Sequence, residues 1–388
     1  MQPDLSALDP TLGDRDGYLL DADGADSTQR YLSGFSAPDS FVTCYTPAGI
    51  HLLVSGLEYG RAQKEARADT VTRLSAYDYR KRVAKLGRAT GRGAVVADFL
   101  ADHGVGGVMV PGRFPLGTAD GLRESGVAVE VDESDAVAEI RAVKTSDEID
   151  HVRRAQRANE RAMAAAESLI ESASVVDGVL HHDGDPLTSE AVRREIELTL
   201  LREGCALDET IVACGADAAD PHDRGSGPLR ADEPIVVDIF PRDKETRYHA
   251  DMTRTFLKGE PTPTLREWFD LTDEARKAAL DAVEPGVTGA QVHDAVCDVY
   301  EDAGLSTLRA DPDAETGFIH STGHGVGLDV HELPRVAPDG GELEPGNVIT
   351  IEPGLYDPDV GGVRIEDLVV VTEDGYENLT EYPVELVV

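Results

Sequence analysis

The sequence predicts an α+β protein of two domains, and three observations lead to that prediction. A chain of 388 residues that is 41% hydrophobic is long enough to fill more than one large core. The first 142 residues alternate short apolar runs with polar, arginine-containing stretches, which is typical of an α/β domain. From residue 143 onward, two helices followed by strands occur twice, which indicates a duplicated α+β domain.

In the N-terminal domain, residues 1–142, apolar runs fall at 41–45, 51–54, 95–100, 107–110 and 127–131. Short apolar runs of this kind predict strands, and the polar stretches between them predict helices. Residues 1–142 contain no cluster of catalytic residue types. The chemistry is therefore expected in residues 143–388.

The domain boundary is expected just before residue 143, because Thr145 and Glu148 form a capping-box pattern that begins a helix. Apolar residues then recur at helical spacing, which predicts a long amphipathic helix near 147–171. Residues 172–186 contain His181, His182 and several aspartates. Tandem histidines can bind a metal, but we expect this segment to be a solvated loop.

Both halves of the second domain follow the same order of elements. In the first half, a helix near 188–203 joins the long helix before strands at 210–214, 235–240 and 250–257. In the second half, helices near 265–283 and 289–303 come before strands at 347–352 and 363–372. Thr288 and Gln291 form another capping box, and Gly304 is the stop signal of that helix.

The charge of the chain excludes two classes of partner. There are 74 acidic and 36 basic residues, a formal net charge of −38, which repels nucleic acid and anionic membrane surfaces. The acidic residues are spread along the whole chain, and seven lysines accompany 29 arginines. This composition resembles that of proteins from salt-loaded cytoplasm, so we expect a halophilic protein whose charges are screened by salt.

The four cysteines form no CxxC pair, so neither a disulfide framework nor a thiolate metal site is indicated. The N-terminus has no basic region followed by an apolar core, and no run of about 18 apolar residues occurs. We therefore expect a cytoplasmic protein with no membrane partner.

Two aspartates of the second domain stand in apolar strand patterns. Asp238 interrupts the run 235–240, where a lone buried carboxylate is unfavourable unless it is paired. If 241–248 is a hairpin loop, Asp251 would face Asp238 across an antiparallel pair at about 5 Å. Two facing aspartates need a cation, which a metal ion or Arg254, in a plain salt bridge, could supply.

Three more potential ligands follow. His324 lies between glycines in the segment 321–328, while Glu352 and Glu366 lie in apolar strand patterns where an unpaired glutamate is improbable. Together the four carboxylates and a neutral imidazole carry −4, which two divalent ions would balance. A water between two such Lewis acids would ionise near neutral pH, which indicates hydrolysis by a metal-bridging hydroxide. Oxygen ligands with one nitrogen favour Mn²⁺, with Co²⁺, Fe²⁺ and Zn²⁺ as alternatives.

The five residues stand in the segments VVDIF, DMTRT, STGHGVGLDVHELP, ITIEPGLY and GGVRIED. In this order the segments resemble the dinuclear M24 metallopeptidases of the pita-bread fold, and specifically their Xaa-Pro aminopeptidase and Xaa-Pro dipeptidase (prolidase) branch. Residues 30–39 resemble the creatinase-type N-terminal domain of that branch, and residues 140–155 resemble the entry to its catalytic domain. The resemblance implies a creatinase-type α/β domain at 1–142 and a pita-bread catalytic domain at 143–388.

Roles for the site residues follow from the resemblance. Asp238 would chelate one metal, Asp251 and Glu366 would bridge both, and His324 with Glu352 would complete the second. Glu352 would also shuttle a proton. Three histidines match substrate-site positions and would hydrogen-bond the substrate carbonyl and the tetrahedral intermediate, although each taken alone is by default a packed or surface histidine: His222, His320 and His331. Arg364 would support Glu366 or a substrate group, with a structural ion pair as the alternative.

The resemblance implies a metal-dependent exopeptidase, active as a homodimer, whose substrate is a peptide with proline at the second position. One departure concerns Asp238 and Asp251, which are thirteen residues apart, two more than in the common family pattern. An even insertion at the turn keeps both side chains on one face. The alternatives are an M24-type hydrolase of a small non-peptide amide, such as a compatible solute or an acylated amino acid, and a non-catalytic pita-bread binding module.

Overall fold

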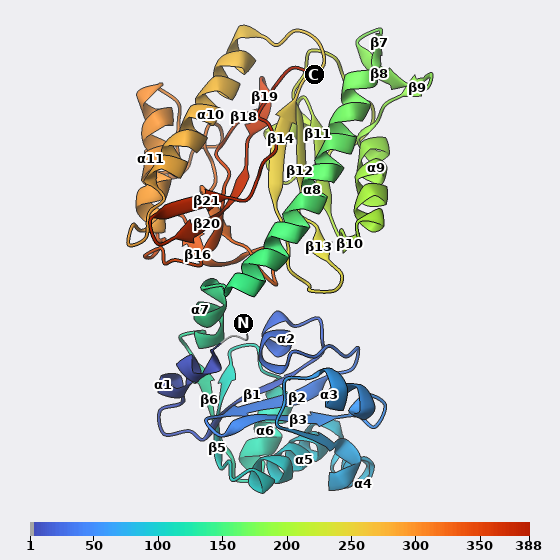
Figure 1. Cartoon of the computed structure of the whole chain (residues 1–388), viewed down its shortest axis with the longest axis vertical. Coiled ribbons are helices and arrows are strands. Elements are labelled where there is room, and N and C mark those ends of the chain that lie inside the picture. The colour runs from blue at the N-terminus through green and yellow to red at the C-terminus, as the bar shows by residue number, and fades with distance from the viewer. Residues whose placement is uncertain (1–3) are drawn as a thin grey trace. The chain divides into compact units, whose positions relative to one another are not determined.

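A computed structural model describes residues 4–388 of the chain. Internal contacts separate two units, one ending at Arg141 and one spanning Ala142–Val388, and both combine helices with sheets (Figure 1). Among residues 4–388, no helix is long and apolar enough to cross a membrane.

The N-terminal unit contains a six-stranded sheet in the order β4-β3-β2-β1-β5-β6. β2 is antiparallel to both of its neighbours, and the remaining pairs are parallel. The strands are β1 (Gly17–Ala22), β2 (Phe41–Thr46), β3 (Gly49–Val54), β4 (Thr70–Arg73), β5 (Gly107–Pro111) and β6 (Ala128–Asp132).

Helices cover both faces of this sheet. α5 and α6 bury Val96, Phe99 and Leu122 with one face, while α3 buries Ala62 with the other. The helical segments are η1 (Leu5–Leu8), α1 (Asp9–Leu12), α2 (Ser27–Ser33), α3 (Tyr59–Glu65), η2 (Leu74–Tyr77), α4 (Tyr79–Leu86), α5 (Arg88–Asp102), α6 (Leu116–Glu124) and α7 (Ala136–Ala142).

The strand expected at 95–100 is wrong, because these residues belong to α5. Val95, Val96, Phe99 and Leu100 are all buried, and α5 packs against the sheet, α4 and α6. A helix buried on several sides has a nearly continuous apolar run, which short-range periodicity does not distinguish from a strand.

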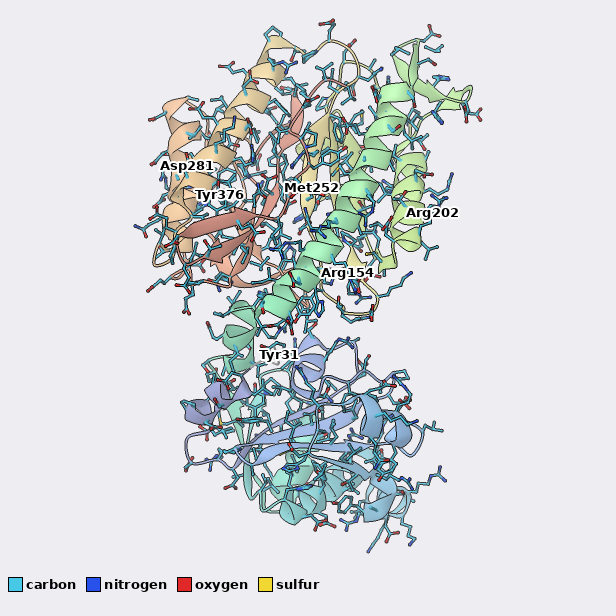
Figure 2. All side chains as sticks on the ribbon, viewed as in Figure 1. Tyr31, Arg154, Arg202, Met252, Asp281 and Tyr376 are labelled. Atoms are coloured by element: carbon cyan, nitrogen blue, oxygen red, sulfur yellow. The ribbon has the colours of Figure 1, made fainter. Side chains whose placement is uncertain are left out.

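The second unit repeats a pair of helices with a sheet. α8 (Ser146–Ser172) and α9 (Ser189–Arg202) share a core with the sheet of β11 (Thr210–Cys214), β12 (Ile235–Ile239) and β14 (Met252–Phe256). Met252 points into this core, whereas Arg202 at the end of α9 is exposed (Figure 2). Thr145 caps α8 in the expected box with Glu148.

α10 (Pro263–Ala282) and α11 (Gly289–Asp302) share a second core with a five-stranded sheet in the order β16-β15-β17-β20-β21. Thr288 and Gln291 form the expected capping box of α11. The strands of this sheet are β15 (Gly323–Gly325), β16 (Glu332–Val336), β17 (Val348–Ile351), β20 (Asp367–Thr372) and β21 (Gly375–Asn378). The remaining short elements of the unit are β10 (Cys205–Ala206), η3 (Asp217–Ala219), β13 (Arg242–Asp243), β18 (Gly354–Asp357) and β19 (Gly361–Arg364).

The loop expected at 172–186 is also wrong. This segment forms a three-stranded sheet of β7 (Ser174–Val176), β8 (Val179–His182) and β9 (Asp185–Pro186), with His181 and His182 on the middle strand. Two Asp-Gly pairs make its turns, Asp177-Gly178 and Asp183-Gly184, and all four residues have positive φ. Asp-Gly is a strong sequence signal for a two-residue hairpin turn.

Candidate metal centre

Strand ends of two sheets bring five potential metal ligands together. Asp238 lies in β12 and Asp251 directly precedes β14, both in the three-stranded sheet. His324 lies in β15, and Glu352 directly follows β17. The strand expected at 363–372 breaks into β19 and β20, and Glu366 lies at the break.

The pairing of β12 with β14 corrects one expectation. Thr253, not Asp251, lies opposite Asp238, and Asp251 lies two residues further along. The connection between β12 and β14 contains β13, which pairs with β10. It also contains Arg247, which has a φ of 74°. The register in which β12 and β14 pair therefore differs from that of a simple hairpin. Because side chains alternate along a strand, the shift of two residues keeps Asp251 on the face of Asp238.

Short distances connect four of the ligands. Nε2 of His324 lies 3.8 Å from Oδ2 of Asp251 and 3.3 Å from Oε1 of Glu352. Asp251, His324 and Glu366 each offer a ligand atom, and these atoms lie within 4.8 Å of one another. A single cation could therefore contact all three residues.

Two threonines orient the glutamates. The hydroxyl of Thr253 donates to Oε2 of Glu366 at 2.8 Å. The hydroxyl of Thr350 donates to Oε1 of Glu352 at 3.0 Å and accepts the backbone N–H of His324 at 3.0 Å. Such outer contacts fix the direction in which ligand oxygens point.

Burial and crowding disfavour ionisation of three carboxyl groups. Burial, followed by the charge of Asp238, raises the pKa of Asp251 well above its ordinary value. Burial and Asp251 likewise raise the pKa of Glu366, and burial raises that of Asp238. Three adjacent carboxylates are therefore stable as anions only when a cation lies among them.

His324 and Glu352 form a charged pair beside these carboxyls. Burial alone would raise the pKa of Glu352, but its hydrogen bond to His324 lowers it to about 2. Burial opposes the charged form of His324, yet Glu352 and Asp251 raise its pKa to about 9. In the absence of metal, the proton on His324 thus partly supplies the positive charge that this site requires.

The donor set fits divalent metal ions. Oδ1 of Asp238 is buried and accepts no hydrogen bond from the described residues. A buried carboxylate oxygen without a donor is unfavourable, and a cation satisfies it. Four carboxylates with one imidazole and no sulfur are the ligands that Mn²⁺, Fe²⁺, Co²⁺ or Zn²⁺ accept.

Arg364, and not Arg254, forms the salt bridge with Asp238. Its Nη2 donates to Oδ2 of Asp238 at 2.7 Å, and its Nε donates to the Thr253 hydroxyl at 3.2 Å. The structural ion pair that was the alternative for Arg364 is therefore present, with Asp238 as its partner. Arg254 was expected to pair with Asp238 and Asp251. It instead forms a salt bridge with Asp367, with 2.8 Å between its Nη2 and Oδ1 of Asp367.

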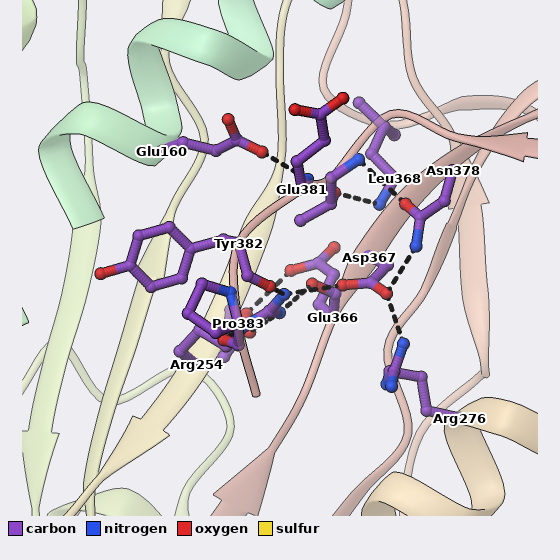
Figure 3. Close-up of polar contacts among 12 residues, drawn as sticks. Glu160, Arg254, Arg276, Glu366, Asp367, Leu368, Asn378, Glu381, Tyr382 and Pro383 are labelled. Atoms are coloured by element: carbon purple, nitrogen blue, oxygen red, sulfur yellow. Dashed lines mark hydrogen bonds and ion pairs between the residues drawn. The ribbon is translucent and has the colours of Figure 1, made fainter. Parts of the chain in front are cut away.

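Arg254 anchors the strand that follows Glu366. Its guanidinium is buried and donates to the carbonyls of Thr253, Glu366, Tyr382 and Pro383 and to Oδ1 of Asp367. Figure 3 shows it between Glu366–Asp367 and Tyr382–Pro383. One buried cation thus joins β14, the start of β20 and the C-terminal segment.

A hydrogen-bonded chain leads from Asp238 to His320. Nδ1–H of His320 donates to the Ser321 carbonyl at 2.7 Å, so its Nε2 accepts from the Tyr356 hydroxyl at 3.0 Å. That hydroxyl accepts from Nη1 of Arg364 at 2.9 Å. Burial lowers the pKa of His320 to about 4 and raises that of Tyr356 to about 12, so both side chains are neutral near pH 7.

The two other predicted histidines lie beside this group. The ring of His331 contacts the ring of His324 edge to face, with centroids 4.2 Å apart. His222 is exposed after η3. Burial lowers the pKa of both His320 and His331, and His222 makes a smaller electrostatic contribution at both rings.

Thr253, Thr350 and Tyr356 were missed by sequence reasoning. Thr253 and Thr350 each lie two residues from a predicted ligand in a strand pattern, at Asp251 and Glu352, and period-two alternation would place them on the ligand face. Tyr356 carries no comparable local signal.

The model of metallopeptidase family M24 matches residues 150–373, which include all the predicted site residues. The chain belongs to metallopeptidase family M24. It is 37% identical over 258 residues to the probable dipeptidase PepE of Mycobacterium tuberculosis, an alignment that covers 66% of this chain and 63% of that protein. It is 33% identical over 257 residues to the Xaa-Pro dipeptidase of Pyrococcus furiosus, covering 65% of this chain and 67% of that one.

Solved structures extend the likeness of this M24 chain to its whole length. The prolidase of Pyrococcus horikoshii matches with a TM-score of 0.78 and 26% identity, over 98% of this chain and 97% of that one. The Xaa-Pro dipeptidase of Bacillus anthracis matches in fold with a TM-score of 0.82 and 24% identity, over 99% and 98%. The predicted α+β architecture, with a pita-bread fold and an α/β domain before it, is confirmed.

Proposed function

We propose that this M24 chain is a dinuclear metal-dependent exopeptidase that hydrolyses the Xaa-Pro bond at the N-terminus of peptides. The observation that carries the proposal is the cluster of Asp238, Asp251, His324, Glu352 and Glu366, in which Asp251 and Glu366 are buried and the other three are partly exposed. Similarity to chains named Xaa-Pro dipeptidase and prolidase supports proline as the second residue of the substrate.

Asp238 would hold one ion, Asp251 and Glu366 would bridge both ions, and His324 with Glu352 would complete the second. The unpaired oxygen of Asp238 and the repulsion around Asp251 support this set. Bound divalent ions supply Lewis acidity, which polarises a carbonyl and makes water nucleophilic near neutral pH. Among the metals that this donor set accepts, we propose Mn²⁺.

The side chains of the chain itself would do the rest of the chemistry. Glu352 would accept a proton at a carboxylate oxygen and pass it to the leaving nitrogen. His222, His320 and His331 would hydrogen-bond the substrate carbonyl as its oxygen gains negative charge. Arg364 would act indirectly, because it orients Asp238 and the Tyr356 hydroxyl.

We further propose that residues 143–388 are the catalytic domain and residues 1–142 a creatinase-type domain, and that the active form is a cytoplasmic, salt-adapted homodimer. Similarity to a probable dipeptidase and to an Xaa-Pro dipeptidase favours a dipeptide substrate over a longer peptide. The longer connection between Asp238 and Asp251 contains β13, which pairs with β10, and we propose that it shapes substrate preference.

Metal removal tests the proposal. Exhaustive chelation should abolish hydrolysis of a Gly-Pro dipeptide, and added Mn²⁺ should restore it. Asp251→Ala and Glu366→Ala should each lose bound metal and activity together, because each removes a shared ligand. Asp374→Ala, at an exposed turn, is the matched control.

Full activity after chelation would contradict the dinuclear mechanism. A Gly-Pro-containing tripeptide in the same assay distinguishes an aminopeptidase from a dipeptidase. Hydrolysis of an N-acyl amino acid without cleavage of either peptide would instead support the small-amide alternative.

A further inference from the structure

The N-terminal unit contains a cavity of about 660 Å³ at one edge of its sheet. Its lining includes Asp21 near the end of β1, Ser55 directly after β3 and Leu74 directly after β4. These three strands run in the same direction, since β1 and β3 are both antiparallel to β2 and β4 is parallel to β3. The cavity therefore lies at the carboxyl ends of the strands.

The topology of the sheet favours a ligand at this edge. The chain passes from β3 outward to β4, then crosses back to β5 on the far side of β1. α3 packs on one face of the sheet, and α5 and α6 pack on the other. In open α/β sheets, ligands bind in the crevice outside the carboxyl ends of the strands where the strand order reverses. The volume lies within the roughly 300–1,000 Å³ that is typical of small-molecule sites.

A buried salt bridge gives the cavity a fixed wall. Nε of Arg92 donates to Oδ2 of Asp21 at 2.7 Å, and the hydroxyl of Thr118 donates to the same oxygen at 2.9 Å. The side chain of Asp21 is 3% exposed and that of Arg92 is 14% exposed. The charges of this pair cancel, so the pair shapes the cavity without attracting a ligand of either sign.

Two further lining residues carry charges that remain available. Arg88 and Asp39 are both exposed, and neither has a hydrogen-bond or ion-pair partner in the described part of the chain. Arg88 also begins α5, and the first turn of α6 lines the cavity through Gly117 and Thr118. Neither helix has a side-chain cap at its N-terminus, and uncapped N-termini favour a carboxylate.

We propose that this cavity binds a short zwitterion with apolar side chains, namely an apolar amino acid or dipeptide. Its carboxylate pairs with Arg88 and the first turns of α5 and α6, and its ammonium group pairs with Asp39. The apolar side chain lies against Pro38, Leu74 and Pro115, which supply apolar lining. A simple anion such as phosphate would leave Asp39 unpaired and repelled.

Calorimetric titration of the full-length, Mn²⁺-loaded protein tests the site, with L-leucine and L-leucyl-L-leucine as probes. At least one probe should bind once per chain, and the double variant Arg88→Gln/Asp39→Asn should weaken that binding about tenfold or more. The matched control is Arg123→Gln/Asp120→Asn, an exposed ion pair outside the cavity, which should leave binding unchanged. N-acetyl-L-leucine and L-leucinamide, each lacking one charge, should bind about tenfold more weakly than L-leucine.

Three results would overturn the proposal. The first is that neither probe binds at concentrations up to about 10 mM. The second is that the two double variants weaken binding equally, and the third is that inorganic phosphate binds more tightly than both probes. Because the mutated side chains are exposed, a thermal midpoint equal to that of the unmodified protein checks that each variant folds. The cavity lies entirely in the N-terminal unit, so binding that the Arg88→Gln/Asp39→Asn variant weakens is not binding at the proposed peptidase site.

Discussion

Replacing Asp367 with Asn should lower the free energy of unfolding of the C-terminal unit by about 3–5 kcal/mol. Asp367 is 2% exposed, and its carboxylate accepts hydrogen bonds from Arg254 at 2.8 Å, Arg276 at 2.5 Å and Asn378 at 2.9 Å (Figure 3). Arg276 keeps Asp273 as a second partner. Arg254 is 1% exposed and has no comparable route to water, so the substitution leaves a buried guanidinium without its counter-charge.

Trp268 provides the assay, because it is the single tryptophan and lies buried in α10 of the C-terminal unit. Its fluorescence reports unfolding of that unit, whereas a global signal would mix two units that need not unfold together. The expected loss corresponds to a fall in the thermal midpoint of about 6–20 °C. Asp374→Asn, at an exposed turn, is the control and should change stability by less than about 0.5 kcal/mol.

The same substitution should reach the metal centre through the backbone. Nη1 of Arg254 donates to the carbonyl of Glu366 at 2.6 Å, so loss of the Asp367 charge frees a group that positions a ligand. Metal affinity should fall about 10-fold or more, as for other outer contacts of metal ligands. A destabilisation below about 1 kcal/mol would refute the buried-pair reasoning, and unchanged metal affinity would refute the positioning of Glu366.

Three further predictions concern other parts of the molecule. His222→Ala and His331→Ala should each keep the bound metal yet lower kcat by about 10²–10³, and a loss of metal content would contradict their assignment to the substrate. With a net charge of −38, the thermal midpoint should rise steeply from dilute buffer toward molar KCl, and a flat midpoint would contradict the salt-adapted interpretation. Burial lowers the pKa of His51 and of His103, whose rings stack with centroids 3.9 Å apart. The unfolded state therefore binds more protons than the folded state, and the N-terminal unit should lose stability as pH falls below about 6.5. His51→Gln should reduce that pH dependence. If thermal midpoints from circular-dichroism melts fell with pH equally steeply in the variant and the unmodified protein, the prediction would be wrong.

Local signals in the sequence predicted local structure well. Each capping box needs only four consecutive residues, and both Thr145–Glu148 and Thr288–Gln291 form as expected. The two Asp-Gly turns at 177–178 and 183–184 are signals of the same kind, and reading them would have replaced the expected loop with strands. The run 95–100 is different, because an apolar run of six residues fits a buried helix as well as a strand.

Non-local pairings were beyond the sequence. The ligands could be identified from residue type and strand pattern. The register of Asp238 opposite Thr253 could not, because the connection between β12 and β14 contains β13, which pairs with β10 from an earlier part of the chain. Similarly, Arg254 is close to Asp251 in sequence and was the obvious counter-ion. Side chains alternate along β14, so Arg254 lies on the opposite face from Asp251 and Thr253 and pairs with Asp367 instead.

The position of Arg364 changes the charge balance of the centre. Four carboxylates alone are neutralised by two divalent ions, but Arg364 lies 2.7 Å from Asp238 and adds one positive charge within the same buried group. With two ions bound as proposed and His324 neutral as a ligand, these groups would carry a surplus of one positive charge, which the proposed metal-bridging hydroxide would balance. When the hydroxide attacks, its negative charge would pass to a substrate oxygen, and the positive charge of Arg364 would favour that oxygen because the arginine is itself buried. We therefore propose that Arg364 contributes to catalysis through this electrostatic field, while its salt bridge with Asp238 holds it in place.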